Sequence, residues 1–317
     1  MGDQKGESLP IRTDLIGKRD YFIMSNLVLE HQGAQMTIQT VGAEMRGFRT
    51  ADGVQRLWSG NPEVWKGVAP TLFPNIGAMV NDTVTVEGKP CAMMKHGFAR
   101  HMEYTPVRVG DSFCTLRLTD TEETLRNYPF HFSLDITHAF TPGGFVTAYL
   151  VENRDERAMP FCIGGHPGFT CPIGQNERFE DYEIRFETEE EGVSYLCGEH
   201  GVLCGTEKVP LGADHRTLKL EYATYDQKDT LVFANLRSRS VELVHRETGR
   251  GMRFSFPQFP ALAIWTMPGK KAPYVCIEPW IGLPAITGET GRYEDKPFCQ
   301  TLAKGKSFLA WYEMTVI

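Results

Sequence analysis

A glutamate and a histidine, each followed directly by proline, are the residues whose types and positions best suit proton transfer. Glu278 ends the apolar run Tyr274–Ile277, and His166 follows the run Pro160–Ile163 after two glycines. Because proline disfavours the helical conformation of the residue before it, both side chains are expected to project from extended backbone where a strand ends. A histidine with a pKa near 6.5 can donate a proton at neutral pH, and an ionised glutamate can accept one.

An acid and a base of this kind suit a substrate that carries an exchangeable hydroxyl and an ether oxygen, as a sugar does. Trp280 follows Glu278 closely and offers an apolar face, and the glycines around His166 leave space for a ligand to approach the backbone. His96, in Met94–Arg100 after the loop Ala69–Gly77, is a second candidate histidine. The alternatives are structural: a strand-end glutamate paired with a lysine or arginine, and histidines held by hydrogen bonds.

Other kinds of chemistry lack their sequence signals. No group of Cys, His and Asp has the spacing of zinc ligands, and no Gly-x-Ser-x-Gly motif marks a nucleophilic serine. No Gly-x-Gly-x-x-Gly motif runs from a strand into a helix, as a dinucleotide site requires. We therefore predict neither a metal nor a cofactor.

Composition narrows the partners to small molecules. The net charge is −7 and no dense Lys/Arg run occurs, so we expect no nucleic-acid or membrane surface. The first twenty residues lack the apolar core of a signal peptide. The eight cysteines contain no C-x-x-C pair, which favours reduced, mostly buried thiols in a cytoplasmic protein. We expect a monomer or a homodimer.

Short runs of β-branched and aromatic residues, separated by Gly, Pro, Asn and Asp, predict an all-β fold of antiparallel strands. Thr119–Asn127 is the one segment expected to form helical turns, and Tyr182–Phe186 alternates as a strand with one solvated face does. No linker or repeat divides the chain. We predict a flexible N-terminus at 1–15 and a single β-sandwich domain at 16–317. The strand predictions are Met36–Val41, Thr83–Val86, Phe113–Leu118, Phe145–Val151, Tyr182–Phe186, Leu231–Ala234, Val241–Val244, Met252–Phe256 and Phe308–Val316.

Four stretches together resemble the aldose 1-epimerase (galactose mutarotase-like) superfamily, and in particular its LacX-type branch, which is similar to the hexose-phosphate mutarotases. They are HGFAR at 96–100, VENRDERAMPFCIGGHPGF at 151–169, FPALAIWT at 259–266 and VCIEPWIG at 275–282. Their order and spacing cover nearly all of residues 20–317. The resemblance implies a β-supersandwich, in which large antiparallel sheets hold a sugar in a concave cleft.

The resemblance also implies roles for residues at matching positions. His166 would protonate the ring oxygen, and Glu278 would remove the proton of the anomeric hydroxyl, so that the ring opens and recloses as the other anomer. His96 would hydrogen-bond the ring oxygen or a neighbouring hydroxyl. The other residues expected to bind substrate are Arg100, Asp229, Trp265 and Trp280.

One departure from the family pattern bears on the substrate. Ala78 stands where the family usually has a sugar-binding arginine, so Arg100 or Arg46 would have to replace it. Lys95, Arg100, Lys270 and Lys271 lie near the motifs and could bind a sugar phosphate. The expected function is an aldose 1-epimerase acting on a hexose or hexose phosphate. The alternatives are a carbohydrate-binding or regulatory protein that has lost turnover, and other acid–base chemistry on sugars.

Overall fold

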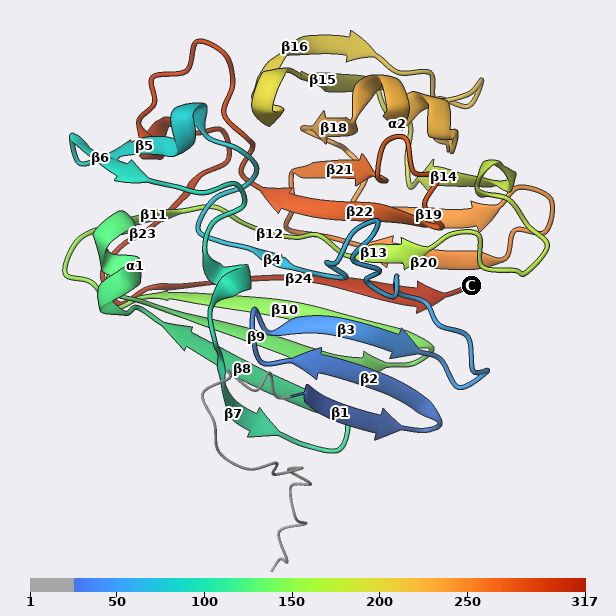
Figure 1. Cartoon of the computed structure of the whole chain (residues 1–317), viewed down its shortest axis with the longest axis horizontal. Coiled ribbons are helices and arrows are strands. Elements are labelled where there is room, and N and C mark those ends of the chain that lie inside the picture. The colour runs from blue at the N-terminus through green and yellow to red at the C-terminus, as the bar shows by residue number, and fades with distance from the viewer. Residues whose placement is uncertain (1–25) are drawn as a thin grey trace, which may run out of the picture.

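The computed structural model describes residues 26–317, which form antiparallel sheets. The predicted flexible segment 1–15 lies outside these residues, and the domain boundary at residue 16 stays a prediction. Figure 1 shows the strands of two large sheets in two layers, with β22 in one layer and β24 and β10 in the other.

The larger sheet has nine strands. In spatial order they are β17 (Thr217–Lys219), β14 (Tyr182–Phe186), β19 (Ser240–His245), β20 (Gly251–Ser255), β24 (Ser307–Val316), β10 (Gly144–Asn153), β9 (Phe132–Thr141), β8 (Phe113–Thr119) and β7 (Thr105–Val109). The long strands β10 and β24 alternate buried and less buried residues along most of their length, which is the two-residue period of a strand with one face on the core.

The second sheet carries the functional residues. Its strands are β16 (Leu203–Lys208), β15 (Val193–Cys197), β18 (Thr230–Ala234), β21 (Ala261–Trp265), β22 (Tyr274–Ile281), β12 (Ile163–Gly165) and β4 (Thr71–Leu72), with β13 (Gly168–Thr170) also paired to β22. Every residue of β22 is buried. Because it pairs with β21 on one side and with β12 and β13 on the other, β22 is the centre of this sheet.

The remaining secondary structure among the described residues consists of three small sheets and a few short helices. The small sheets are β1 (Asn26–His31), β2 (Ala34–Gln39) and β3 (Glu44–Arg49); β5 (Thr83–Val86) and β6 (Lys89–Ala92); and β11 (Met159–Phe161) and β23 (Gln300–Leu302). The α-helices are α1 (Glu122–Asn127) and α2 (Tyr222–Lys228), and the 3-10 helices are η1 (Val80–Asp82), η2 (Ala99–His101), η3 (Phe179–Asp181), η4 (Glu199–Gly201) and η5 (Tyr293–Asp295). No helix within residues 26–317 is long and apolar enough to cross a membrane.

Aromatic side chains join the sheets into one core. Phe169 of β13 meets Phe254 of β20 with ring centroids 5.5 Å apart, and Phe186 of β14 meets Phe233 of β18 at the same centroid distance. Burying aromatic rings of this size is a dominant contribution to core stability. The sheet that contains β22 therefore packs against the nine-stranded sheet through these aromatic contacts.

The predicted strands are confirmed at each of the nine positions, with bounds that agree to within a few residues, and the predicted helical segment contains α1. Thr121 caps α1 by accepting a hydrogen bond from the Thr124 backbone N–H. In β14, Tyr182, Ile184 and Phe186 are buried, whereas Arg185 on the other face is partly exposed. Glu183, on the same face as Arg185, is buried and pairs with it at 2.7 Å. The predicted solvated face is therefore only partly solvated, and the ion pair compensates the burial of the Glu183 carboxylate.

Candidate active site

Strand register brings Glu278 and His166 together. Gly164 of β12 pairs with Trp280, and Gly168 of β13 pairs with Cys276. The two pairings follow the same register, so His166, midway between the two glycines, lies directly opposite Glu278. Its ring Nε2 is 3.2 Å from the Glu278 Oε1 atom. The predicted acid and base, which are more than a hundred residues apart in the sequence, are therefore in direct contact.

Small residues leave room for this pair. Glu278 is opposite Ala263 of β21, which in turn is opposite Val232 of β18, so no large side chain stands beside the carboxylate in the row. A Cβ on Gly168 would lie 2.9 Å from the Trp65 ring. Glycine at this position allows the indole to pack over the histidine, with ring centroids of Trp65 and His166 4.9 Å apart.

The pair is buried but incompletely hydrogen-bonded. Glu278 is 1% exposed and His166 is 9% exposed. Glu278 Oε2 and His166 Nδ1 have no partner of regular hydrogen-bond geometry among residues 26–317. Since buried polar atoms are normally paired, the two free atoms are suited to a polar ligand.

Burial acts on the two protonation equilibria in opposite directions. It raises the pKa of Glu278 well above the usual value, and the positive charge of Lys95 opposes this rise. Burial, opposed by a hydrogen bond to the residue's own backbone and helped by the charges of Arg100 and Lys95, lowers the pKa of His166 to about 3. Both effects disfavour the charged form of each group. Burial thus favours the neutral form of both groups, with the exchangeable proton of the pair on Glu278 rather than on His166. The titratable or charged side chains around the pair are His96, Lys95, Arg100, Asp229 and Cys276.

Because an ionised carboxylate is costly to bury, Glu278→Gln is expected to raise the melting temperature by about 2–4 °C at pH 8. A carboxyl whose pKa is raised by folding stabilises the protein below its unfolded pKa, and this contribution is lost as the pH rises toward the folded pKa. The gain of the variant should therefore be smaller at pH 5 than at pH 8. Differential scanning fluorimetry at both pH values measures it. A variant that melts below the wild type at pH 8 would contradict the assignment of strain to this carboxylate.

His96 lies beside the pair in a fixed tautomer. Its ring is 5.6 Å from that of His166, centroid to centroid, and its Nδ1 accepts a hydrogen bond of 3.1 Å from the Gly77 backbone N–H. Burial, followed by the charges of His166, Arg100 and Lys95, lowers the pKa of His96 well below its usual value. A neutral imidazole whose Nδ1 accepts must carry its proton on Nε2. His96 can therefore donate one hydrogen bond from Nε2.

Tryptophans form the walls of the site. Trp265 crosses His166 edge to face at 5.5 Å, and its Nε1 donates a 3.0 Å hydrogen bond to Asp229, the residue that ends α2. Trp280 lines the pocket next to Glu278, and its indole N–H has no partner of regular geometry among the described residues. All seven predicted site residues line one open pocket of about 280 Å³. This volume is close to the lower end of small-molecule sites, about 300–1,000 Å³.

Two of the cations expected near the site line the pocket. Arg100 donates hydrogen bonds to His101 Nε2 and to the Lys95 carbonyl oxygen, and Lys95 lines the same pocket. Arg46 instead pairs with Glu44 at 2.9 Å, and neither Lys270 nor Lys271 lines the pocket.

Lys95 supplies positive charge beside Ala78. A Cβ on Gly201 would lie 3.8 Å from both the Ala78 Cβ and the Lys95 Nζ. The ammonium group has no hydrogen bond or ion pair within residues 26–317. Lys95 is thus the side chain that brings a cation to the position where the family arginine is absent.

Sequence reasoning missed two side chains of this site. Trp65 lies in an irregular segment with no strand period, and the only signal was its neighbourhood of glycine and proline. Cys276 was missed because it lies in the apolar run Tyr274–Ile277, where the sequence pattern does not distinguish it from a core residue. Donor atoms of His166, Cys276 and Glu278 lie within 4.8 Å of one another, a spacing that a divalent cation could share. Free His166 Nδ1 argues against a built metal centre, because metal-binding histidines usually donate from the other ring nitrogen.

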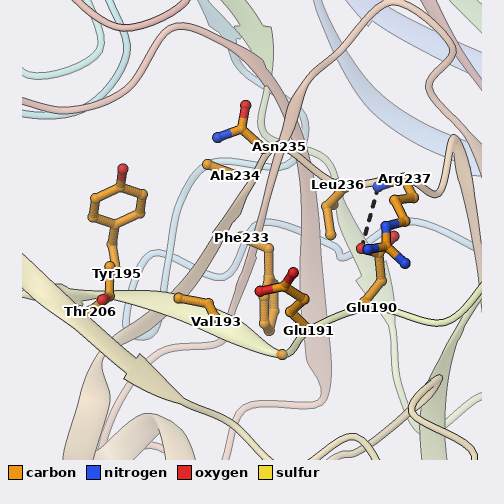
Figure 2. A pocket seen from close by; sticks show the side chains of 11 residues that line it. Glu190, Glu191, Val193, Tyr195, Thr206, Phe233, Ala234, Asn235, Leu236 and Arg237 are labelled. Atoms are coloured by element: carbon orange, nitrogen blue, oxygen red, sulfur yellow. Dashed lines mark hydrogen bonds between the residues drawn. The ribbon is translucent and has the colours of Figure 1, made fainter.

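A second hollow of similar volume lies farther along β15 and β18 (Figure 2). Tyr195, Asn235 and Glu191 line it, and the Glu190 carboxylate accepts hydrogen bonds from the backbone N–H groups of Arg237 and Ser238. None of the predicted site residues lines this hollow. The Glu190 carboxylate is occupied by backbone donors, and Glu191 has no histidine beside it in the lining of this hollow, so the acid–base pair belongs to the pocket at His166.

Comparison with known proteins identifies the family. Residues 25–315 match the family model described as Aldose 1-epimerase. The chain belongs to this family. Two relatives from Lactococcus lactis subsp. lactis, "Protein LacX, chromosomal" and "Protein LacX, plasmid", are each 31% identical to it over 300 residues, which cover 92% of this chain and 100% of the relative. The predicted resemblance to the LacX-type branch is confirmed.

Solved structures confirm the predicted fold class. A "galactose mutarotase related enzyme" from Lactobacillus acidophilus superposes with a TM-score of 0.86 at 28% identity and covers 92% of this chain and 97% of its own. A "galactose mutarotase-like protein" from Lactobacillus casei ATCC 334 has the same TM-score at 29% identity and covers 92% and 100%. The aldose 1-epimerase family member described here thus has the galactose mutarotase-like architecture of large antiparallel sheets.

Proposed function

We propose that the protein is an aldose 1-epimerase that interconverts the α and β anomers of a hexose or hexose phosphate. The observation that carries this proposal is the 3.2 Å contact between His166 Nε2 and Glu278 Oε1 beside an open pocket. Mutarotation requires proton transfer at the ring oxygen and at the anomeric hydroxyl, which are bonded to the same carbon. An acid and a base in direct contact are placed to reach two such neighbouring oxygens.

The reaction begins with the pyranose held against the tryptophans. Glu278 removes the proton of the anomeric hydroxyl while His166 protonates the ring oxygen, so that the ring opens to the aldehyde. Rotation about the bond between the first two carbons presents the other face of the carbonyl group. Reversal of both proton transfers then closes the ring as the opposite anomer. His96, with its proton on Nε2, donates a hydrogen bond to the ring oxygen or to a neighbouring hydroxyl.

Substrate hydroxyls can shift the proton of the pair. Hydrogen bonds donated to Glu278 Oε2, which has no partner of regular geometry among residues 26–317, favour the ionised carboxylate. The proton of the pair then moves across the 3.2 Å contact to His166 Nε2. Glu278 is then ionised and can act as the base, and His166 is protonated and can act as the acid. Because the pair has no net charge before or after this transfer, the step does not bury a new net charge.

This shared proton predicts an unusually flat pH profile. Below the lowered pKa of His166 the pair gains a second proton and loses its base; above the raised pKa of Glu278 it loses its last proton and its acid. Between these limits the protein-catalysed rate is expected to change less than about twofold with pH. A histidine acting alone with a pKa near 6.5 would instead lose about 20-fold between pH 6 and pH 8. Exchange rates corrected for the spontaneous reaction decide between the two.

Lys95 and Arg100 make a phosphorylated sugar a specific candidate. Both cations line the pocket, and the Lys95 ammonium group is free to bind an anionic oxygen. If the substrate is phosphorylated, Lys95→Met is expected to lower kcat/KM for the phosphate ester at least about tenfold more than kcat/KM for the free hexose, since any effect of Lys95 on the acid–base pair acts on both substrates. Lys270→Met, outside the pocket, serves as the matched control.

The experiment that tests the function is a panel of freshly dissolved anomers, with and without phosphate. Polarimetry follows α-glucose and α-galactose, and NMR follows anomer exchange of the hexose 6-phosphates. Acceleration proportional to protein concentration supports the proposal. Methyl α-glucoside, which has no anomeric hydroxyl, should remain unchanged.

Two results would overturn the proposed activity. Saturable sugar binding by calorimetry without anomer exchange would make the protein a carbohydrate-binding or regulatory member of the family. Release of methanol from the glucoside, or any other bond cleavage, would assign different acid–base chemistry. The cytoplasmic location and the monomeric or homodimeric state stay predictions.

A further inference from the structure

Two cysteines outside the sugar pocket are cross-strand neighbours. Strands β11 and β23 pair with Met159 opposite Leu302 and Phe161 opposite Gln300. Continuing this register by one residue places Cys162 directly opposite Cys299. The Cys162 N–H donates to Pro74 and the Cys299 N–H donates to Lys296, so these two residues do not exchange backbone hydrogen bonds.

That arrangement suits a disulfide. Opposed residues that are not hydrogen-bonded to each other in antiparallel strands have Cα atoms about 4.5 Å apart, with close side chains. Disulfides require Cα separations of about 4.4–6.8 Å. The Cys299 Sγ atom lies 3.6 Å from the Phe161 carbonyl oxygen, next to Cys162 in the chain. Both residues are free thiols in the structure.

The surroundings favour reaction of this pair. A hydrogen bond from Cys299 lowers the pKa of the Cys162 thiol; burial opposes this effect, and the charge of Lys296 and a hydrogen bond from Tyr293 add to it. The thiolate is the reactive form of cysteine. Cys162 is fully buried, whereas Cys299 is partly exposed and gives a small oxidant access from solvent. A charged Lys296 side chain, 1% exposed and 3.2 Å from Glu289, keeps positive charge near the sulfur atoms.

We propose that Cys162 and Cys299 form a redox-reactive dithiol, which a peroxide converts into an intramolecular disulfide. The thiolate of the pair attacks one peroxide oxygen, giving a sulfenic acid and releasing one water after protonation. The second thiol then attacks the sulfenic sulfur, forming the S–S bond and releasing a second water. Two thiols and one hydrogen peroxide thus give one disulfide and two waters, with the sulfur atoms oxidised and the peroxide reduced. This reaction goes beyond the proposed mutarotase activity and does not depend on it.

Closure of the bond ties the segment before His166 to the C-terminal part of the chain. The disulfide closes a loop of about 140 residues, and long loops give large entropic stabilisation in the chain-entropy model. The melting temperature is expected to rise by about 3–7 °C on oxidation and to return when dithiothreitol is added.

Mass spectrometry of the whole protein after treatment with hydrogen peroxide tests the proposal. The expected result is a loss of two hydrogens and a non-reduced peptide that joins Cys162 to Cys299, with both the peptide and the temperature shift absent in Cys299→Ser. The matched control Cys204→Ser, which removes an exposed thiol elsewhere, should keep both. Two results would overturn the proposal. One is a cross-link between Cys197 and Cys204 with no link between Cys162 and Cys299; the other is oxidation of Cys299 without a bond to Cys162. Mapping of the wild type needs no variant, so a folding defect cannot mask the outcome.

Discussion

Replacing Glu278 by glutamine is expected to slow protein-catalysed anomer exchange by about 10³-fold. Glutamine keeps the shape of the side chain, but it cannot take the proton of an anomeric hydroxyl at neutral pH. Glu278 is buried at the centre of β22, and Asp229, the other carboxylate that lines the pocket within residues 26–317, already accepts the Trp265 indole hydrogen bond and is not placed to replace it. Polarimetry of fresh α-hexose, or NMR exchange for a phosphate ester, measures the loss.

Glu183→Gln is the matched control, because Glu183 is also a buried glutamate but lies in the nine-stranded sheet, paired with Arg185. Its rate should stay within about twofold of the wild type. The Glu278→Gln variant should also bind sugar, which calorimetry can show, so loss of turnover is separated from loss of the pocket. Retention of more than a tenth of the wild-type rate would remove Glu278 from the reaction.

His166→Asn is expected to produce a loss of similar size, about 10²–10⁴-fold. Asparagine can hydrogen-bond but cannot pass a proton between Glu278 and the ring oxygen. Because the two groups share one proton across a 3.2 Å contact, the double variant His166→Asn/Glu278→Gln should be little slower than either single variant.

If the rate loss of the double variant instead equals the product of the two single-variant losses, the two groups act independently. His215→Asn, an exposed histidine outside the pocket, controls for the substitution itself and should leave the rate unchanged. Melting temperatures of all variants verify that each protein is folded.

Strand identities could be predicted because the local pattern and the tertiary environment agree. Thr83–Val86 and Tyr182–Phe186 were predicted with their observed bounds, since β-branched and aromatic residues there are bounded by polar turns. The buried position of Glu183 could not be predicted, because it depends on the strands that happen to flank β14. Local alternation predicts on which face of the strand a residue lies, but not how far the side chains of neighbouring strands shield it from solvent.

The candidate site was predictable in its members but not in its geometry. Glu278 and His166 stood out through the prolines that follow them and through the family resemblance. Their contact depends on β12 and β13 pairing with the same strand in one register, which is a long-range property. Trp65 reaches His166 from an irregular segment, and the Lys95 ammonium group lies beside Ala78 only after folding, so neither placement leaves a periodic signal in the chain.

Exchange spectroscopy at anomeric equilibrium tests the His166–Glu278 proton transfer most directly. With wild-type protein and the preferred hexose or hexose phosphate, cross-peaks between the α and β anomeric proton signals should grow in proportion to protein concentration. They should fall to the spontaneous level with Glu278→Gln and with His166→Asn. Equal cross-peaks in the wild type and both variants would contradict the assignment of these two side chains as acid and base.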